Sequence, residues 1–347
     1  MSLPPYLLPT LIEKTGTSWR FDAYVVGIGF DRRAGRAAFA LGDGTLRLVD
    51  LADPAAAPAV AAAHDGGLLS FAADPRGGFV SGGDDGRLVH TAADGAVSEL
   101  HRGKGAWIDQ LAVAPDGMTI AFAGGKTVNL LGGQRQPLGG PLVHPSSVGG
   151  LAFDPRGKRL FAAHYNGVSA WWANAQAQQP RLLKWTGSHL GATVSPDGRF
   201  LVTAMQENAL HGWRLADGAD MRMTGYPAKT HSLSWMAKGR FLATSGSGSV
   251  VCWPFQGKDG PMGKPPLEMG GDRRGVITRV AAHPAQDVVA AGFDDGFVAL
   301  YRVENDRRVD IRRAGDGPVT ALAWSADGRF LALGTEDGFA GLIGFGG

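Results

Sequence analysis

Apolar and polar residues alternate along short stretches of this chain, and tight turns separate these stretches at a nearly constant spacing. Each repeat has an alternating stretch, a turn rich in Asp, Pro and Gly, a second apolar stretch, an acidic or Asn-Gly turn, and a third stretch. Alternation with a period of two is typical of β-strands with one buried face. The unit returns eight times, at intervals of about forty residues. The pattern predicts an all-β chain.

Glycines in the first turn of each repeat fix the register. Glycine adopts a positive φ at such a corner without steric cost. An apolar residue follows three positions later almost every time, which indicates one repeated spatial role. The glycines are Gly35, Gly77, Gly117, Gly157, Gly198, Gly239 and Gly328, with Ala285 and Gln286 in the equivalent place of the seventh repeat. The residues three positions on are Ala38, Val80, Ile120, Leu160, Leu201, Leu242 and Leu331.

A repeat of this length is the signature of a propeller blade. We expect one domain over residues 1–347, a closed propeller of eight four-stranded antiparallel blades. Seven closed blades with an appended hairpin are the alternative, because the first unit has a poor turn and the seventh lacks its glycine. The eight units cover about residues 24–63, 64–105, 106–145, 146–187, 188–229, 230–274, 275–316 and 317–347.

The last unit has no room for a fourth strand before Gly347. The segment around Leu8–Thr15 lies outside the first unit, and we therefore expect residues 1–16 to supply a strand that completes the last blade. Ring closure of this kind protects sheet edges that an open array would expose. Deletion of residues 1–16 is expected to lower stability or solubility.

The composition excludes several function classes. A net charge of +2 argues against a broad surface for nucleic acid, and the acids within Arg302–Arg313 favour a solvated edge strand there. Cys252 is the only cysteine, so no internal disulfide can form. No run of about twenty apolar residues predicts a membrane span. The first residues lack the charged segment of a secretory signal, so we expect a cytoplasmic protein.

No motif predicts catalysis or a cofactor. Gly125-Lys126-Thr127 is similar to part of a phosphate loop, but Ile120 occupies the place of the first glycine that this loop needs. Paired cysteines and the His-Glu-x-x-His motif are absent from the sequence, and the nine histidines are scattered. The loop aspartates are explained by turn formation. We expect neither a metal nor another cofactor.

Two turns carry a family resemblance. Ser195-Pro-Asp-Gly198 and Ser325-Ala-Asp-Gly328 resemble the Ser-Pro-Asp-Gly turn of WD40 repeats, and the fuller segments 193–204 and 322–334 strengthen the match. The resemblance covers about Tyr24 to Phe345. It implies a propeller of four-stranded blades that acts as a binding platform.

The chain departs from that family in its polar residues. It has no Trp-Asp and no Gly-His dipeptide. The family's network links a His before the first strand, a Ser or Thr on the second, an Asp in the next turn and a Trp on the third. The resemblance implies the fullest network in the fifth unit, partial ones in the second and fourth, and only two members in the sixth. The respective residues are His189, Thr203, Asn208 and Trp213; His64, Ser81 and Asp85; His144, Asn166 and Trp171; and Ser245 and Trp253.

These features favour a non-catalytic scaffold, a monomeric ring that binds another protein through the loops around its channel. The loops between units and the turns after the second strands should share one face, and aromatic and Arg side chains dominate binding hot spots. The candidate binding residues are Trp19, Arg20, Lys104, Trp107, Tyr165, Tyr226, Arg273 and Arg274. An enzyme on a propeller frame, either a metal-dependent hydrolase or a quinone-type dehydrogenase, is the alternative. A peptide or small ligand in the channel is a third possibility.

Overall fold

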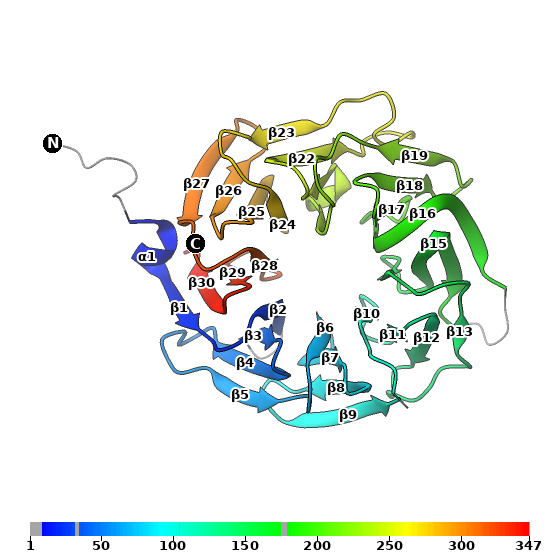
Figure 1. Ribbon diagram of the computed structural model, residues 1–347, viewed down its shortest axis with the longest axis horizontal. Coiled ribbons are helices and arrows are strands. Elements are labelled where there is room, and N and C mark those ends of the chain that lie inside the picture. The colour runs from blue at the N-terminus through cyan, green and yellow to red at the C-terminus, as the bar shows by residue number, and fades with distance from the viewer. Residues whose placement is uncertain (1–8, 32–34, 104, 175–178, 347) are drawn as a thin grey trace.

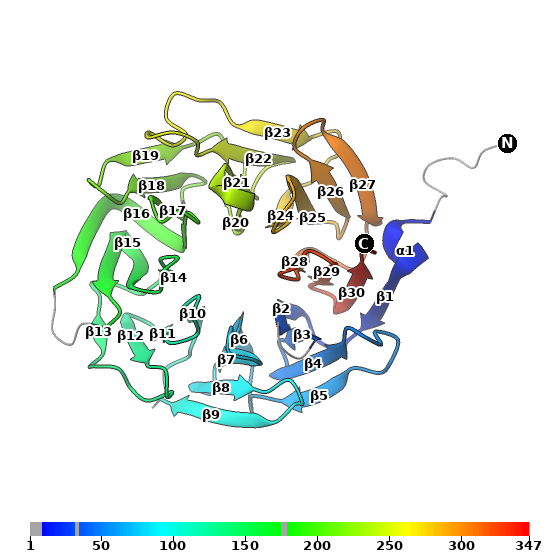
Figure 2. The ribbon, with the colours of Figure 1, turned by 180° about the vertical axis from the view of Figure 1, so that it is seen from behind.

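The computed structural model describes residues 9–31, 35–103, 105–174 and 179–346. They form a ring of antiparallel sheets around a central axis, and the first strand of most sheets lies nearest that axis (Figures 1 and 2). Hydrogen bonding joins the strands into six four-stranded sheets and one six-stranded sheet. The prediction of an all-β propeller is confirmed.

The first three sheets follow the chain order without crossover. The first contains β2 (Val25–Asp31), β3 (Arg36–Leu41), β4 (Thr45–Asp50) and β5 (Ala59–Ala62). The second contains β6 (Leu68–Ala73), β7 (Phe79–Gly83), β8 (Arg87–Thr91) and β9 (Val97–Arg102). The third contains β10 (Gln110–Val113), β11 (Ile120–Gly124), β12 (Thr127–Leu131) and β13 (Leu142–Val143).

The remaining sheets complete the ring. The six-stranded sheet contains β14 (Gly150–Phe153), β15 (Arg159–Trp172), β16 (Arg181–Val194), β17 (Phe200–Met205), β18 (Leu210–Arg214) and β19 (Asp220–Met223). The next contains β20 (Leu233–Trp235), β21 (Phe241–Thr244), β22 (Ser249–Pro254) and β23 (Leu267–Gly270), with a short 3₁₀ turn at Ala237–Gly239. Then come β24 (Ile277–Ala282), β25 (Val288–Phe293), β26 (Val298–Arg302) and β27 (Arg307–Arg312).

The number of sheets differs from the main prediction. Eight separate four-stranded sheets were expected, whereas the strands group into seven sheets, the number in the alternative. The difference arises at the predicted units 146–187 and 188–229. There β16 pairs with β15 through its first half and with β17 through its second half, so one strand of 14 residues joins both units.

The N-terminal segment completes the last sheet, as expected. That sheet contains β28 (Val319–Trp324), β29 (Phe330–Thr335), β30 (Phe339–Gly344) and β1 (Gly16–Arg20). β1 pairs with β30 from Gly16↔Ile343 to Arg20↔Phe339. The location within residues 1–16 was wrong, because Leu11–Thr15 form the helix α1 and the strand begins only at Gly16. Glu13 explains the helix, since its carboxylate accepts hydrogen bonds from the Thr10 amide (2.6 Å) and hydroxyl (2.9 Å) at the N-terminus.

The core lies between neighbouring sheets. All seven residues at the fixed offset from the turn glycines are completely buried, so their shared role is to fill the space between sheets. The turns themselves follow the sequence. In the Ser195 turn, Gly198 has φ 72° and its amide donates to Ser195 O at 2.8 Å. The seventh turn manages without glycine because His283 Nδ1 accepts hydrogen bonds from the amides of Ala285 (3.1 Å) and Gln286 (3.0 Å).

Candidate functional site

The connections between repeat units pack on the turns after the second strands, so both sets of loops lie on one face. We call this the loop face. Backbone hydrogen bonds join each connection to the turn beside it: Phe21 N to Gly338 O (2.9 Å), Gly103 N to Gly86 O (2.8 Å), Val148 N to Gly125 O (2.8 Å) and Gly315 N to Asp295 O (2.7 Å). The shared face that the sequence predicted is therefore present.

Two exposed aromatic residues stand on adjoining parts of the loop face. Trp107 is 64% exposed in the connection between β9 and β10, and Tyr165 is 53% exposed near the turn within β15. The Tyr165 amide donates to Ser146 Oγ at 2.9 Å, which holds its backbone against the preceding connection. Trp107 O packs so closely on Gly124 that a side chain there would collide with it.

A groove of about 590 Å³ lies beside Tyr165. We call Trp107, Tyr165 and this groove the aromatic sector. The groove combines apolar surface with hydroxyl groups and one lysine. Its lining residues are Pro145, Ser146, His164, Tyr165, Asn166, Val168, Leu182, Leu183, Lys184, Trp185 and Thr186. The sequence singled out Trp107 and Tyr165 but not the groove, which forms only where Leu182–Thr186 pack beside Tyr165.

The candidate arginines are partly engaged within the molecule. Arg20 forms an ion pair with Asp316 and donates to Asp337 O at 3.2 Å. Arg273 donates to Asp295 Oδ2 at 2.7 Å, and its guanidinium lies 3.9 Å from the centre of the Phe297 ring. Arg274 is exposed beside it. These arginines help to tie turns together on the loop face, so they offer a partner less than free cations would.

The sequence predicted Trp19 and Arg20 in a loop, but both residues belong to the strand β1. The pairing of Trp19 with Ala340 and of Arg20 with Phe339 puts both on the closing strand. Trp19 packs at the edge of a core cluster, against Phe21 (ring centroids 6.5 Å apart) and Phe39 (5.7 Å). The prediction failed because the closing strand begins later in the sequence than expected. Lys104 lies outside the described residues.

Tyr226 is not an exposed anchor. It is 8% exposed, and its hydroxyl lies 2.7 Å from Thr244 Oγ1 and accepts a hydrogen bond from Trp253 Nε1 at 2.7 Å. Burial raises the pKa of Tyr226 to about 12, so the phenol stays neutral. Its place before β20, its hydroxyl partner on β21 and its Trp partner on β22 are those that a His would have. Tyr226 thus supplies the sixth unit with a network that the sequence did not predict.

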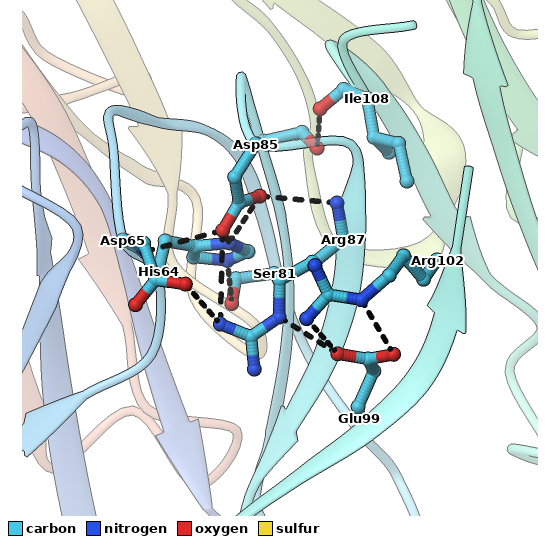
Figure 3. Close-up of polar contacts among 9 residues, drawn as sticks. His64, Asp65, Ser81, Asp85, Arg87, Glu99, Arg102 and Ile108 are labelled. Atoms are coloured by element: carbon cyan, nitrogen blue, oxygen red, sulfur yellow. Dashed lines mark hydrogen bonds and ion pairs between the residues drawn. The ribbon is translucent and has the colours of Figure 1, made fainter. Parts of the chain in front are cut away.

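The most complete polar network lies in the second unit (Figure 3). His64 Nε2 is 2.8 Å from Ser81 Oγ, and His64 Nδ1 is 3.1 Å from Asp85 Oδ1. Asp85 also accepts the Arg87 amide at 3.0 Å. Arg87 Nε in turn donates to Glu99 at 2.9 Å, which connects the network to the outer strand β9. The expectation that the fifth unit comes nearest to a full network was wrong, because there His189 bonds Thr203 (2.8 Å) but Asn208 bonds only Pro227 O (3.4 Å).

Ser81, His64 and Asp85 are hydrogen-bonded in the same sequence as the residues of a Ser-His-Asp catalytic triad. The burial of Ser81 and His64 shows that here the three residues have a structural role. Ser81 is 1% exposed and the His64 side chain is fully buried, so a substrate cannot reach the hydroxyl. Burial lowers the pKa of His64 despite the opposing effect of Asp85. Burial acts to raise the pKa of Asp85, but hydrogen bonds from the Arg87 amide and from His64 lower it overall. A neutral imidazole that donates from Nδ1 to the carboxylate and accepts from Ser81 satisfies all three groups.

Two further properties concern residues 9–31, 35–103, 105–174 and 179–346. No group of three or more His, Cys, Asp or Glu side chains there is arranged to hold a metal ion. None of the helices found there is both long and apolar enough to cross a membrane.

Comparisons with known proteins agree with this geometry. Residues 281–345 match the family model of the anaphase-promoting complex subunit 4 WD40 domain. Telomerase protein component 1 from Rattus norvegicus is 24% identical over 349 residues, and the match covers 95% of this chain but 12% of that protein. WD repeat-containing protein 55 from Rattus norvegicus is 24% identical over 204 residues, 57% of this chain and 52% of that protein.

These matches support the WD40-repeat β-propeller family for this chain. Autophagy-related protein 16 from Arabidopsis thaliana is also similar, 23% identical over 86% of this chain and 59% of that protein. The crystal structure of the computationally designed Ika8 protein has the same fold, with a TM-score of 0.75 at 17% identity over 94% of this chain and 98% of that one. Compared with the WD40 pattern, this propeller has a full His-Ser-Asp network in one unit and uses Tyr226 in another.

Proposed function

We propose that this WD40 propeller is a non-catalytic scaffold that binds another protein through its loop face, with the aromatic sector as the main anchor. One observation carries the proposal: Trp107 and Tyr165 are largely exposed on adjoining parts of a face where two of the three candidate arginines already have partners within the molecule. Large aromatic side chains lose little conformational entropy on binding and are enriched at hot spots.

The relatives add general support. The anaphase-promoting complex subunit and the telomerase protein component are, as their names state, parts of larger assemblies. A rigid ring that holds its loops in place has little ordering cost on binding. Three statements remain predictions from the sequence: the chain has no enzymatic activity, it is a monomer, and it is cytoplasmic.

Alanine variants test the proposal. After affinity purification has identified a partner, Trp107→Ala and Tyr165→Ala should each weaken its binding by about tenfold or more, since a hot-spot side chain contributes about 2 kcal/mol or more and a tenfold change corresponds to about 1.4 kcal/mol. Trp172→Ala is the matched control, since Trp172 is similarly exposed (58%) but is the last residue of β15, away from the turn at Asn166 that lies beside Tyr165. If Trp107→Ala and Tyr165→Ala bind the partner as tightly as Trp172→Ala does, the aromatic sector is not the anchor.

We further propose that the six-stranded sheet is two blades joined at β16, which gives the ring eight repeat units. The support comes from β15, whose Asn166 (φ 66°) and Gly167 (φ 139°) bend the chain sharply in mid-strand. The Ala173 amide donates to Lys158 O at 2.8 Å, so the two ends of β15 lie side by side as a hairpin. Leu215 N and Arg199 O form the equivalent bond (2.8 Å) across β17 and β18.

An experimental structure viewed down the ring axis tests this unit count. Eight radial sheets, with a break in the backbone hydrogen bonds of β16 near Ser188, would support the proposal. Seven radial sheets, with β16 continuous between two sheets, would refute it.

A further inference from the structure

The described strands nearest the ring axis carry a single basic residue. The strands nearest the axis are β2, β6, β10, β14, β20, β24 and β28 (Figures 1 and 2). Arg279 on β24 is the only Lys or Arg in these strands, and Asp31 on β2 is the only acid. Residues Leu190–Val194, the second half of β16, have no charged side chain either. A lone charge in an otherwise apolar and hydroxyl-bearing wall needs a physical reason.

Asp31 does not neutralise Arg279. Asp31 is buried at the far end of β2, where its carboxylate accepts the Gly78 amide at 2.6 Å. The guanidinium of Arg279 is held by two backbone carbonyls instead: Nε donates to Thr320 O at 2.6 Å and Nη1 donates to Thr278 O at 3.0 Å. Burial lowers the pKa of Arg279, and no carboxylate of the described chain offsets this effect. The group nevertheless stays charged at neutral pH, because a guanidinium does not lose its proton in proteins.

A polar pocket of about 380 Å³ adjoins this guanidinium. Thr193, Thr230, His231, Ser232 and Arg279 provide its polar lining. Thr193 Oγ1 accepts Trp235 Nε1 at 3.0 Å, which leaves the hydroxyl proton of Thr193 to donate into the pocket. Burial is the main cause that lowers the pKa of His231, and the positive charges of Arg279 and Lys229 lower it further. Arg279 and Lys229 therefore both lie close enough to His231 to interact with it electrostatically.

We propose that this pocket binds an oxyanion, a carboxylate or phosphate group, on the Nη1–Nη2 edge of Arg279. The two carbonyls fix the orientation of the guanidinium and engage Nε, while Nη2 has no hydrogen-bond partner in the described ranges. A planar guanidinium edge matches the two oxygens of such an anion. Thr193 and His231 lie in the same lining as additional donors. This site goes beyond the proposed scaffold function, because a small anion binds without any protein partner.

Titration of the full chain tests the site. Inorganic phosphate and sodium acetate are each added at constant ionic strength, while NMR records the Nε–Hε signals of ¹⁵N-labelled protein. One arginine signal should shift saturably, with a dissociation constant of about 1–10 mM, as expected for one charged group. A response to phosphate alone identifies a phosphate site, and a response to acetate alone identifies a carboxylate site. If neither anion causes a saturable shift in the native protein, the proposal is overturned.

Variants assign the site to Arg279. Arg279→Lys keeps the charge but loses the planar edge, and the saturable shift should weaken by about tenfold or disappear. Arg222→Lys is the control, since Arg222 is exposed on the outer strand β19 and should leave the titration unchanged. An undiminished response in Arg279→Lys would overturn the assignment. Neither result depends on the partner-binding test of Trp107 and Tyr165.

Discussion

Some buried polar side chains in this propeller have hydrogen-bond partners among the described residues, whereas others have none. His211 has a fully buried side chain, and Trp185 stacks on its ring with centroids 3.9 Å apart and an interplanar angle of 15°. Neither ring nitrogen makes a hydrogen bond to a described residue, and Asp220 Oδ2 is 3.5 Å from Nε2. Burial lowers the pKa of His211 to about 3, with smaller contributions from His189 and Arg222. His211 therefore acts as a neutral, aromatic packing residue.

Replacing His211 should reduce the acid sensitivity of the fold. The unfolded chain protonates this His near its ordinary pKa of about 6.5, whereas the folded chain does not, so its contribution to stability is complete above that pH and is lost as the pH falls towards 3. At pH 5 the loss is about 2 kcal/mol. In urea titrations, His211→Phe should lose about that much less stability than the native chain between pH 7 and pH 5. An identical loss in both proteins would show that His211 is protonated in the fold.

Tyr226 gives a second prediction at this scale. Thr244 Oγ1 donates to Val251 O at 3.1 Å, so it accepts the Tyr226 hydroxyl proton. Tyr226→Phe removes that bond and leaves Trp253 Nε1 without its acceptor, which should lower the free energy of unfolding by about 1–3 kcal/mol.

The matched control is Tyr24→Phe. Tyr24 is 44% exposed, so the same change there should alter the free energy of unfolding by less than about 0.5 kcal/mol. Partner binding should survive in Tyr226→Phe. Loss of binding without loss of stability would restore Tyr226 as a binding anchor.

Some of the residues discussed above could be predicted from the sequence, and others could not. Turn glycines and the residues three positions later follow from backbone geometry and a fixed offset, and all seven of the latter are buried. Tyr226 was misplaced because a tyrosine replaces the expected His and the change is visible only once Thr244 and Trp253 surround it. Arg279 was missed because one charge in an alternating strand carries no signal until the neighbouring inner strands are aligned.

Among the elements, the closing strand connects the two ends of the described chain. β1 pairs with five successive residues of β30, and α1 buries Ile12 in the cluster of the last two sheets. The sequence predicted the closure because the last unit lacked a strand. It did not predict α1, although Thr10 and Glu13 have the spacing of a capping box, since Leu8–Thr15 was assigned to the strand that the last unit lacked.

Removal of β1 should destabilise the ring more than any loop change. Deletion of residues 1–20 removes the strand and exposes the edge of β30, so we expect a lower melting temperature and aggregation. A peptide of residues 9–21 added to the truncated chain should restore the melting temperature in part. Native-like melting of the truncated chain, without the peptide, would mean that β1 does not close the ring.

On the scale of the whole molecule, the ring places loops from distant parts of the sequence on one face. Trp107 and Tyr165 reach the aromatic sector only because the connection beside Gly124 and the one at Ser146 are adjacent in the ring. The repeat period predicted this arrangement, whereas the grouping into seven sheets depends on hydrogen bonds along β16 that no turn signal in the sequence reveals. The groove beside Tyr165 is likewise a product of packing.

Hydrogen exchange with and without the identified partner tests the central claim most directly. Binding through the loop face should slow exchange at residues 105–109, 145–149 and 164–168, which contain or adjoin the aromatic sector. The outer strands β5, β9, β19 and β27 should exchange as in the free protein. Slower exchange along those outer strands, with none at the aromatic sector, would contradict the account.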